Sequence, residues 1–460
     1  MSPDTQPPHR LAWRDAALAA VARPTWDINH VIAYGQSLAL GWEGWPALSL
    51  TQPYDSLMLG GSVRPADVWG TAWRPVGGAE LRPLVATVQH TETNALLTAA
   101  QVAALPKGHT ALGETVLEAA VNRWRGGLLH AGVEPGSHRL LASAVGQGGR
   151  SIEALSRGAI PPLFDRFGAC VGLARVTAAA ADLSYGVTAL LFLQGEHNAP
   201  AMGGCTSDGA TYRAHLAKLH RDLLAEVAAL TGQIVPPALF SYQTGGFFSN
   251  RTNSIAQAQF DFALATPGVF MVAPTYPVTA KLGHLDANGY RWLGAQFGKA
   301  MHRVLTLWQD FLPLHPLRAT LAGRRLRVLF HVPVPPLRIG RPFADHSVVA
   351  PPDCGFAVQD ESGKVPLLGV AQSSADSMVL TLARAPAGEV TLLYADKSVG
   401  GRGALHDSDA EVAADPYVYD PATGHYATAN HPDLNGRPYP LHNWCVAFVI
   451  PVQVAATGAG

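Results

Sequence analysis

The sequence predicts an α/β protein in which a doubly wound parallel sheet is followed by a smaller all-β sandwich domain. Short apolar runs alternate with longer helical periods from Asp27 to about Trp308, and β-branched runs replace those periods after Pro316. At 460 residues the chain also exceeds what one hydrophobic core usually supports. We therefore expect an N-terminal extension over 1–26, an α/β domain over 27–312 and a β-domain over 316–456.

Five apolar runs of the first domain are bounded by glycine or proline, which is typical of buried parallel strands. These runs are Val31–Tyr34, Leu140–Val145, Val187–Leu193, Ala238–Tyr242 and Val269–Ala273. Between them, apolar residues recur at three- or four-residue spacing from Leu216 to Leu230 and stop at Gly232, which predicts an amphipathic helix. The last helix of this kind presents Tyr290, Leu293, Phe297, Met301 and Leu305 on one face, and Asp286 is expected to be its N-cap.

Residues 45–135 interrupt the alternation of strands and helices. This segment is rich in glycine, proline and tryptophan, and one helix is evident, near Glu114 to Trp124. We interpret it as a long insertion over the carboxyl edge of the sheet, where such segments usually shape a substrate cleft. Trp69 and Trp73 lie in this insertion, and Trp42 and Trp45 precede it. Core packing and a platform for a sugar ring or an acyl group are the two alternatives for these four residues.

The C-terminal domain is predicted from runs with β-branched residues between turn signals. The runs are Arg325–Val334, Val365–Val370, Ser377–Leu382 and Glu389–Tyr394. A glycine turn, Gly400–Gly403, and an acidic stretch, Asp407–Glu411, are interpreted as solvated loops, with lining of a cleft or calcium binding as alternatives. We expect no metal there.

Composition excludes several classes of function. A net charge of −1 and a pI near 7.0 provide no field for nucleic acid or anionic lipid, so a small-molecule or glycan substrate fits better. No apolar run is long enough to span a membrane, and no signal peptide is evident, which makes cytoplasm the default location and leaves a secreted or surface assembly open. The four cysteines lack metal-ligand spacing and are expected to be free thiols. No metal or cofactor is expected.

Three polar segments follow predicted strands, where parallel α/β sheets hold their chemistry. Gly35-Gln36-Ser37 places a hydroxyl after the first strand, although a serine of this kind taken alone is more often a turn or N-cap residue. Gly146-Gln147-Gly148-Gly149 brings flexible backbone N–H groups before a helix; it matches a dinucleotide fingerprint only superficially, because the acidic residue of that motif is missing. Gln194-Gly195-Glu196-His197-Asn198 gathers two amides, a carboxylate and an imidazole.

Together with Gly283-His284-Leu285-(x)₃-Gly289-Tyr290, the order of these segments resembles the SGNH hydrolase superfamily, and most of all the sialate O-acetylesterase and acetylxylan esterase-like carbohydrate esterases. The resemblance covers residues 27 to 308 and implies an SGNH/flavodoxin-like sheet. It implies that Ser37 is the nucleophile and that His284 is the general base. Donors to the oxyanion would be the Ser37 N–H, Gly148 or Gly149, and the Gln194 or Asn198 side chain. Gln36 is a further candidate for this substrate-binding group.

One position departs from the superfamily pattern. Lys281 stands where the superfamily commonly has an aspartate three residues before the catalytic histidine. Glu196 is the first candidate to orient the imidazole of His284. Asp286 is the second, although a helix cap explains it more simply, and a Ser-His dyad oriented by a backbone carbonyl is the third.

The resemblance implies a serine esterase that removes acetyl or another small acyl group from a carbohydrate hydroxyl through an acyl-enzyme. Two alternatives stay open. The same chemistry could act on a lipid, thioester or other non-sugar ester, or the chain could be a glycan-binding protein with a degenerate hydrolase core. The oligomeric state cannot be predicted from these features.

Overall fold

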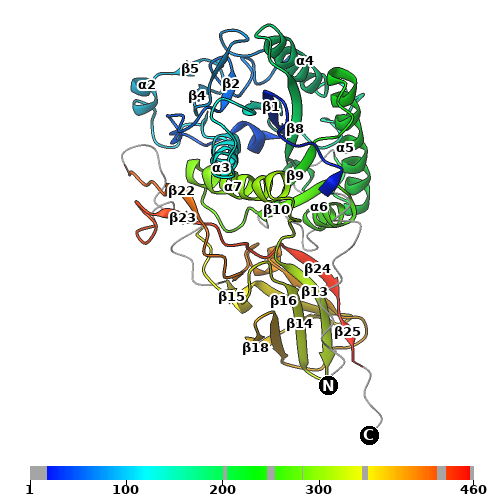
Figure 1. The fold of residues 1–460 in the computed structure, drawn as a ribbon. Helices are drawn as coiled ribbons and strands as arrows, with labels where there is room; N and C mark the ends of the chain where they lie inside the picture. Colours follow the sequence, from blue (N-terminus) through cyan, green and yellow to red (C-terminus); the bar gives the residue numbers. More distant parts are fainter. Residues whose placement is uncertain are drawn as a thin grey trace.

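The computed structural model describes residues 18–199, 205–245, 254–281, 283–343, 351–421 and 431–455, with backbone alone at 280 and 281. Most of the predicted N-terminal extension, residues 1–17, lies outside this set. Figure 1 shows a mixed α/β part, built on a large sheet, and a β-rich part formed by the end of the chain. Within the described ranges, no helix combines the length and the apolar character that crossing a membrane requires.

The large sheet has seven strands in the order β10-β9-β8-β1-β7-β2-β3. All neighbouring pairs are parallel except β2 and β3, and the strand order runs in opposite directions from β1, as in a doubly wound sheet. The strands are β1 (Ile28–Gly35), β2 (Leu57–Leu59), β3 (Leu81–Pro83), β7 (Arg139–Ala144), β8 (Tyr185–Leu193), β9 (Ala238–Gln243) and β10 (Val269–Pro274). The five predicted strands are thus confirmed, and their bounds shift by at most three residues.

Helices cover both faces of this sheet (Figure 1). They are α3 (Val116–His130), α4 (Asp165–Ala179), α5 (Gly209–Thr231), α6 (Ser254–Ala265) and α7 (Ala287–Met301), with the short α2 (Ala99–Ala103) in the insertion. Side chains of β1 alternate between two cores: Val31 and Ala33 join the core that holds α3 and α7, whereas Ile32 and Tyr34 join the core of α4, α5 and α6. Both faces of β1 are therefore buried, which explains why its sequence is a continuous apolar run.

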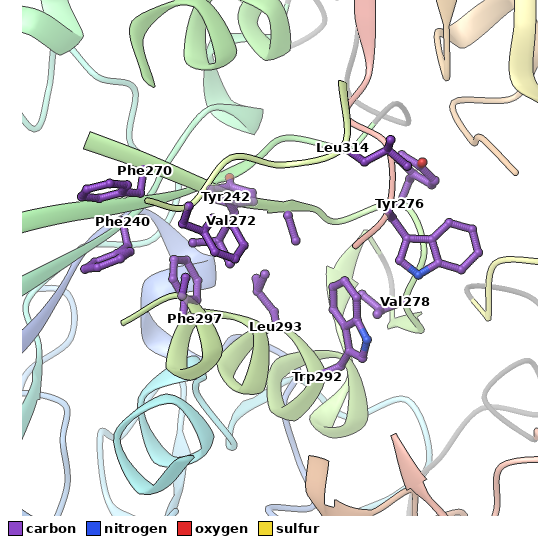
Figure 2. Packing of buried hydrophobic residues seen from close by; sticks show 14 of the residues in the cluster. Phe240, Tyr242, Phe270, Val272, Tyr276, Val278, Trp292, Leu293, Phe297 and Leu314 are labelled. Carbon is purple, nitrogen blue, oxygen red and sulfur yellow. The ribbon is translucent and has the colours of Figure 1, made fainter. Parts of the chain in front are cut away.

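Helix α7 packs closely on one face of the sheet, as Figure 2 shows. Phe297 and Leu293 point from the helix toward the sheet, where the rings of Phe240 of β9 and Phe270 of β10 stack with centroids 5.3 Å apart. Burying aromatic rings of this size contributes on the order of 2 kcal/mol each. Because α7 begins at residue 287, this packing also fixes the chain immediately before it, which contains His284.

The ends of the helices follow the capping signals in the sequence. Helix α7 begins after Asp286, whose carboxylate accepts a 2.7 Å hydrogen bond from the N–H of Gly289, so the predicted N-cap is confirmed. Helix α5 ends at Gly232, which adopts the left-handed conformation with φ 73°, as predicted. Helix α3 begins with a capping box between Thr115 and Glu118.

The predicted insertion at 45–135 is only partly an excursion over the sheet. Strand β2 pairs with β7 and β3 pairs with β2, so this segment extends the large sheet at one edge. A separate small sheet is formed by β4 (Val88–His90), β5 (Leu96–Leu97) and β6 (Ala111–Leu112). Helix α3 then covers the sheet beside α7. The strands of this segment have two or three residues each, which is too short for a periodic pattern to show in the sequence.

The β-rich part contains two larger sheets. The first has the order β18-β19-β14-β13-β25 and the second β17-β16-β20-β24. Phe330 of β14 meets Phe356 of β16 and Phe448 of β24 with ring centroids 6.5 Å and 6.4 Å apart, so side chains of the two sheets contact each other. The strands are β13 (His315–Ala322), β14 (Arg325–His331), β16 (Phe356–Asp360), β17 (Gly363–Val365), β18 (Leu367–Ser374), β19 (Ser377–Leu382), β20 (Thr391–Tyr394), β24 (Phe448–Pro451) and β25 (Gln453–Val454).

Two short strand pairs complete this part. They are β15 (Arg338–Ile339) with β21 (Leu405–His406), and β22 (Val412–Pro416) with β23 (Pro438–Pro440). In Figure 1 the second pair lies beside α7 and away from the two larger sheets.

The acidic stretch Asp407–Glu411 is not a solvated loop. Asp407 is fully buried and accepts hydrogen bonds from the side chain and the N–H of Asn443. Glu411 pairs with Arg123 of α3, and Asp409 pairs with Lys299 of α7 at 3.2 Å. The expectation of a solvated loop was wrong because these carboxylates neutralise cations that two helices of the α/β part present to them.

Lys299 is the most enclosed of these cations. Its side chain is 2% exposed, and its ammonium donates to the carbonyl of Leu441 at 2.6 Å and to Asn443 Oδ1 at 2.9 Å. Burial lowers the pKa of Lys299 to about 8, while Asp409 acts in the opposite direction. On the same helix, Arg291 donates to Asp415 of β22 at 3.2 Å. Helix α7 is therefore held on one side by the sheet and on the other by the C-terminal part of the chain.

Candidate active site

The turn after β1 places Ser37 at the carboxyl edge of the sheet. Gly35 ends the strand with φ 152°, and a Cβ on it would lie 2.0 Å from the carbonyl oxygen of Leu193 on the neighbouring strand β8. Only glycine allows this close approach of two chains. The chain then enters a single 3-10 turn, Ser37–Leu40, and the side chain of Ser37 lines a cavity.

His284 lies against Ser37 in space, although the two residues stand near opposite ends of the α/β part of the sequence. It begins the two-residue strand β12 (His284–Leu285), which pairs with β11 (Ala280–Lys281) and follows Gly283, where φ is 84°. The imidazole Nε2 lies 2.8 Å from the hydroxyl oxygen of Ser37, across a sequence separation of 247 residues. This distance is within the range required for proton transfer between a nucleophile and its base.

A cavity of about 310 Å³ opens beside this pair. Its lining residues are Gln36, Ser37, Leu38, Trp42, Trp69, Gly148, Gly149, Glu196, His197, Gly283 and His284. The indoles of Trp42 and Trp69 meet edge to face with centroids 5.4 Å apart, and Trp42 also lies against the ring of His284 at 6.2 Å. Of the four tryptophans considered in the sequence, these two line the cavity, whereas Trp45 and Trp73 are buried in the cores.

The glycine turn after β7 comes to the same edge of the sheet. A Cβ built on Gly148 would lie 3.8 Å from the Cβ of Ser37, so the peptide of Gly148 is a direct neighbour of the hydroxyl. Gly149 adopts φ 64°, which favours glycine. Among the described residues, neither of these two N–H groups nor that of Ser37 donates a hydrogen bond to the protein. Three backbone donors therefore remain available beside the cavity.

Gln36 combines an anchored oxygen with unused donors. Its Oε1 accepts from the N–H of Gly195 at 3.3 Å and from that of His197 at 3.1 Å, which fixes the orientation of the amide. The residue is 5% exposed and lines the cavity. Its Nε2 has no hydrogen-bond partner in the part of the chain that the structure describes. A buried amide with free donors beside a cavity is well suited to bind an oxygen of a ligand.

The structure does not bring Gln194 and Asn198 to the cavity. Gln194 Nε2 donates to the carbonyl of Arg150 and to Asn198 Oδ1. Asn198 Nδ2 donates to Glu153 Oε2 and to the carbonyl of Thr206, and its Oδ1 accepts from the N–H of Ile152. All amide hydrogens of both side chains are thus already bonded. Instead of facing a substrate, they join the turn after β8 to the chain that follows Gly149.

Glu196 lines the cavity but does not contact His284. Its carboxylate accepts a very short hydrogen bond from the hydroxyl of Tyr242 on β9, and no ion pair joins it to the imidazole among the described residues. Burial raises the pKa of Glu196 to about 7, against the smaller opposing effect of Tyr242. The expectation that Glu196 orients the ring is therefore corrected, because the phenol of Tyr242 holds this carboxyl group.

Oδ1 of Asp286 is occupied as well. Besides capping α7, it accepts a hydrogen bond from the hydroxyl of Thr279 at 2.5 Å, and neither oxygen bonds to His284. The interpretation of Asp286 as a helix cap is confirmed. Lys281 lies in β11, and its side chain is outside the described atoms. Neither carboxylate named in the sequence analysis contacts the imidazole.

Two tyrosines support the site, and the sequence analysis gave neither of them a role there. Tyr242 holds Glu196, and Tyr290 of α7 donates to the carbonyl of Trp42 at 2.9 Å. Both rings are also buried in a core, so their positions in the sequence look like ordinary packing positions. For Tyr242, its place near the carboxyl end of a buried strand is a signal that could have marked it.

The described residues contain no group of three or more histidine, cysteine, aspartate or glutamate side chains placed to hold a metal ion. The four cysteines are free thiols, as predicted.

Comparison with solved structures supports the fold. XAC1771, a carbohydrate acetylesterase from Xanthomonas citri, is 14% identical over 92% of this chain and 80% of its own, with a TM-score of 0.52. NanS is 14% identical over 63% of this chain and 99% of its own, with a TM-score of 0.40. Est24, a carbohydrate acetylesterase from Sinorhizobium meliloti, is 12% identical over 61% and 99%, with a TM-score of 0.30.

No protein-family model and no curated protein matches the sequence. At 14% identity the likeness to XAC1771 is one of fold, and the fold is that of a carbohydrate acetylesterase structure. The resemblance seen in the sequence motifs is confirmed at this level.

Proposed function

We propose that this protein is a serine esterase that removes a small acyl group, such as acetyl, from a carbohydrate hydroxyl through an acyl-enzyme. The observation that carries this proposal is the 2.8 Å contact between Ser37 Oγ and His284 Nε2 beside a cavity of about 310 Å³. A serine hydroxyl is a weak nucleophile unless a base takes its proton, and this contact provides the base.

In the first half of the reaction, Oγ of Ser37 attacks the acyl carbonyl carbon while His284 takes the hydroxyl proton. The carbonyl oxygen becomes an oxyanion in a tetrahedral intermediate. Donors that are already in place stabilise such a charge, because they need no reorganisation during the reaction. The N–H groups of Ser37, Gly148 and Gly149 lie beside the cavity and donate to none of the described residues, and Gln36 Nε2 adds a side-chain donor in place of Gln194 or Asn198.

In the second half, the intermediate collapses and the alcohol leaves with the proton from His284. The acyl group stays on Ser37 as an ester. Water then attacks this ester while His284 takes a proton from the water, and the carboxylic acid leaves as Ser37 recovers its proton. In this proposal His284 is the base in both halves of the reaction, and neither Glu196 nor Asp286 is bonded to its ring.

The cavity favours a carbohydrate ester among the possible substrates. Its walls include the two indoles, and aromatic faces pack well on sugar rings. XAC1771, whose fold is similar, is described as a carbohydrate acetylesterase. For a lipid or thioester substrate, the rate would be maintained as the acyl chain is lengthened, and for a glycan-binding protein without catalysis, Ser37 would not react with a fluorophosphonate probe.

The test is hydrolysis of 4-nitrophenyl acetate by wild type, Ser37→Ala and His284→Ala, with a chelator present. We expect kcat/KM to fall by about 10⁴-fold or more in both variants, because the nucleophile and its base act as a unit. Ser151→Ala is the matched control, since this serine lies near the same turn and its hydroxyl accepts a long 3.4 Å hydrogen bond from the N–H of Ala154. Full activity in Ser37→Ala would refute the proposal.

A further inference from the structure

Glu196 leaves one carboxyl oxygen unused beside the cavity. The residue lines the cavity and is 6% exposed. Its Oε2 accepts the hydrogen bond from Tyr242, whereas Oε1 accepts none from another residue that the structure describes. Within the same ranges, no cation forms an ion pair with this carboxyl group. A polar atom on so enclosed a side chain usually has a partner, and the reaction described above gives Oε1 none.

The orientation of this carboxyl group is fixed from two sides. The backbone N–H groups on either side of it, those of Gly195 and His197, both donate to Gln36 Oε1. Tyr242, whose ring is fully buried, holds Oε2 from strand β9. A group that is fixed before binding loses little conformational entropy when it binds a ligand. Oε1 is therefore positioned in advance for a hydrogen bond.

An alcohol hydroxyl is the chemistry that this group fits. Glu196 is the only carboxylic acid among the lining residues, and they include no lysine or arginine. Burial raises the pKa of Glu196 to about 7, so near neutral pH the group is present in both charged and neutral forms. A hydroxyl can donate to the charged form and accept from the neutral one, whereas a cation binds well only to the charged form.

A hydroxyl bound at Glu196 would lie close to the ester at Ser37. The two side chains line one cavity of about 310 Å³, which is at the lower end of the sizes of ligand sites. Gln36 also connects them, because it directly precedes Ser37 and accepts from both backbone neighbours of Glu196. The groups recognised at the two places are therefore neighbours within one substrate molecule.

We propose that Oε1 of Glu196 binds a free hydroxyl next to the ester in the alcohol part of the substrate. This inference rests on the proposed esterase function and makes Glu196 a determinant of specificity. Ser37 and His284 carry out the reaction as described above, and Glu196 selects esters that have a free neighbouring hydroxyl. A substrate in which this hydroxyl is acylated or absent would lose the hydrogen bond.

The experiment compares trans-2-hydroxycyclohexyl acetate with cyclohexyl acetate, which differ only in one hydroxyl beside the ester. Each kcat/KM is corrected for the rate of alkaline hydrolysis of that ester. At pH 8, where Glu196 is mostly charged, wild type should favour the hydroxy ester about tenfold or more, the usual effect of a hydrogen bond to a charged group.

Two variants locate this preference. In Glu196→Gln the ratio should fall to about two or less, because the amide oxygen accepts from Tyr242 and the cavity then faces N–H donors instead of a charged acceptor. Glu153→Gln is the matched control and should keep the wild-type ratio. This second carboxylate bonds to Asn198 and Thr206 of the same turn but is not a lining residue of the cavity.

The outcomes separate this inference from the function on which it rests. Equal reaction of the two esters in wild type, or no reaction of the hydroxy ester, refutes the hydroxyl site, and so does an unchanged ratio in Glu196→Gln. An equal loss for both esters in that variant would assign Glu196 to the support of its turn and would also overturn the inference. In each case Ser37-dependent hydrolysis of 4-nitrophenyl acetate keeps the esterase, whereas its absence refutes the esterase itself.

Discussion

The turn after β1 and the turn after β8 lie side by side at the carboxyl edge of the sheet, yet they use their polar groups in opposite ways. In the turn after β1, the Ser37 N–H and Gln36 Nε2 lie beside the cavity and bond to no residue that the structure describes. In the turn after β8, every amide hydrogen of the Gln194 and Asn198 side chains has a partner in the protein. The segment that is richer in polar residues is thus the one whose amides are committed to structure.

Under the proposed function, unused hydrogen-bonding capacity, rather than the number of polar side chains, distinguishes the turn that takes part in the chemistry. A group that is already bonded would have to break that bond before it could stabilise a substrate, which costs about as much as it gains. The predictions that follow test whether the two turns have these separate roles.

Among the residues of these two turns, after Ser37 itself, the largest effect is expected at Gln36. Gln36→Met removes both the acceptor and the donors, whereas Gln36→Glu keeps an acceptor for the N–H groups of Gly195 and His197 and loses the donors. If Nε2 donates to the oxyanion, kcat for 4-nitrophenyl acetate should fall about 10²- to 10³-fold in both variants. A near-normal kcat in the Glu variant, with a reduced one in the Met variant, would mean that Gln36 only anchors the neighbouring turn.

A second effect concerns Glu196 and pH. Its pKa is raised from 4.5 to about 7 in the folded protein, so between these values the folded state binds a proton that the unfolded state has lost. The contribution of Glu196 to stability is therefore fully present below about pH 4.5 and is lost as pH rises to 7. As pH rises from 4.5 to 7, we expect the free energy of unfolding of Glu196→Gln to increase by about 3 kcal/mol relative to that of wild type.

Urea denaturation of both proteins at several pH values measures this difference, in which the other titrating groups largely cancel. A constant difference from pH 4.5 to 8 would show that the carboxyl group is not buried in the way that the structure describes.

The smallest effect is expected at Asn198. Asn198→Ala leaves the buried N–H of Ile152 without an acceptor and Glu153 without one of its donors. We expect a loss of about 2 kcal/mol in the free energy of unfolding, with kcat reduced less than tenfold. Should kcat instead fall as far as in Gln36→Met while stability is kept, Asn198 would have to be a donor to the substrate, and the contrast between the two turns would fail.

Much of the α/β fold could be predicted from the sequence because its signals are local. Buried parallel strands such as Val187–Leu193 are continuous apolar runs, and the caps Asp286 and Gly232 stand at the ends of periodic segments. The edge strand β2 could not be predicted, because three residues carry no period and its pairing with β7 is set by tertiary contacts. The prediction of a solvated loop at 407–411 failed for a related reason, since the partners of this acidic stretch, Arg123 and Lys299, are distant in sequence.

The residues of the site that follow parallel strands could be predicted, because the carboxyl ends of such strands lie at one edge of the sheet. That argument places Ser37, Gly148 and Glu196 in one region, and all three line the cavity. It does not specify which hydrogen bonds form there. Tyr242 donates a hydrogen bond to Glu196, and Gln194 donates one to the carbonyl of Arg150. Which of these bonds form depends on side-chain packing between strands and helices, and local sequence patterns do not encode that packing.

The C-terminal part of the chain encloses Lys299 and Arg291 of α7. The geometry of the α/β part therefore depends on the last third of the chain. An ammonium and a guanidinium on α7 are compensated by Asp409 and Asp415, which lie more than a hundred positions further along. A shortened polypeptide ending near 312 would leave Lys299 without Asp409 and Arg291 with Glu114 alone, on the helix that begins three residues after His284. Exchange of the β-rich part between homologous chains would accordingly have to transfer these two aspartates together with it.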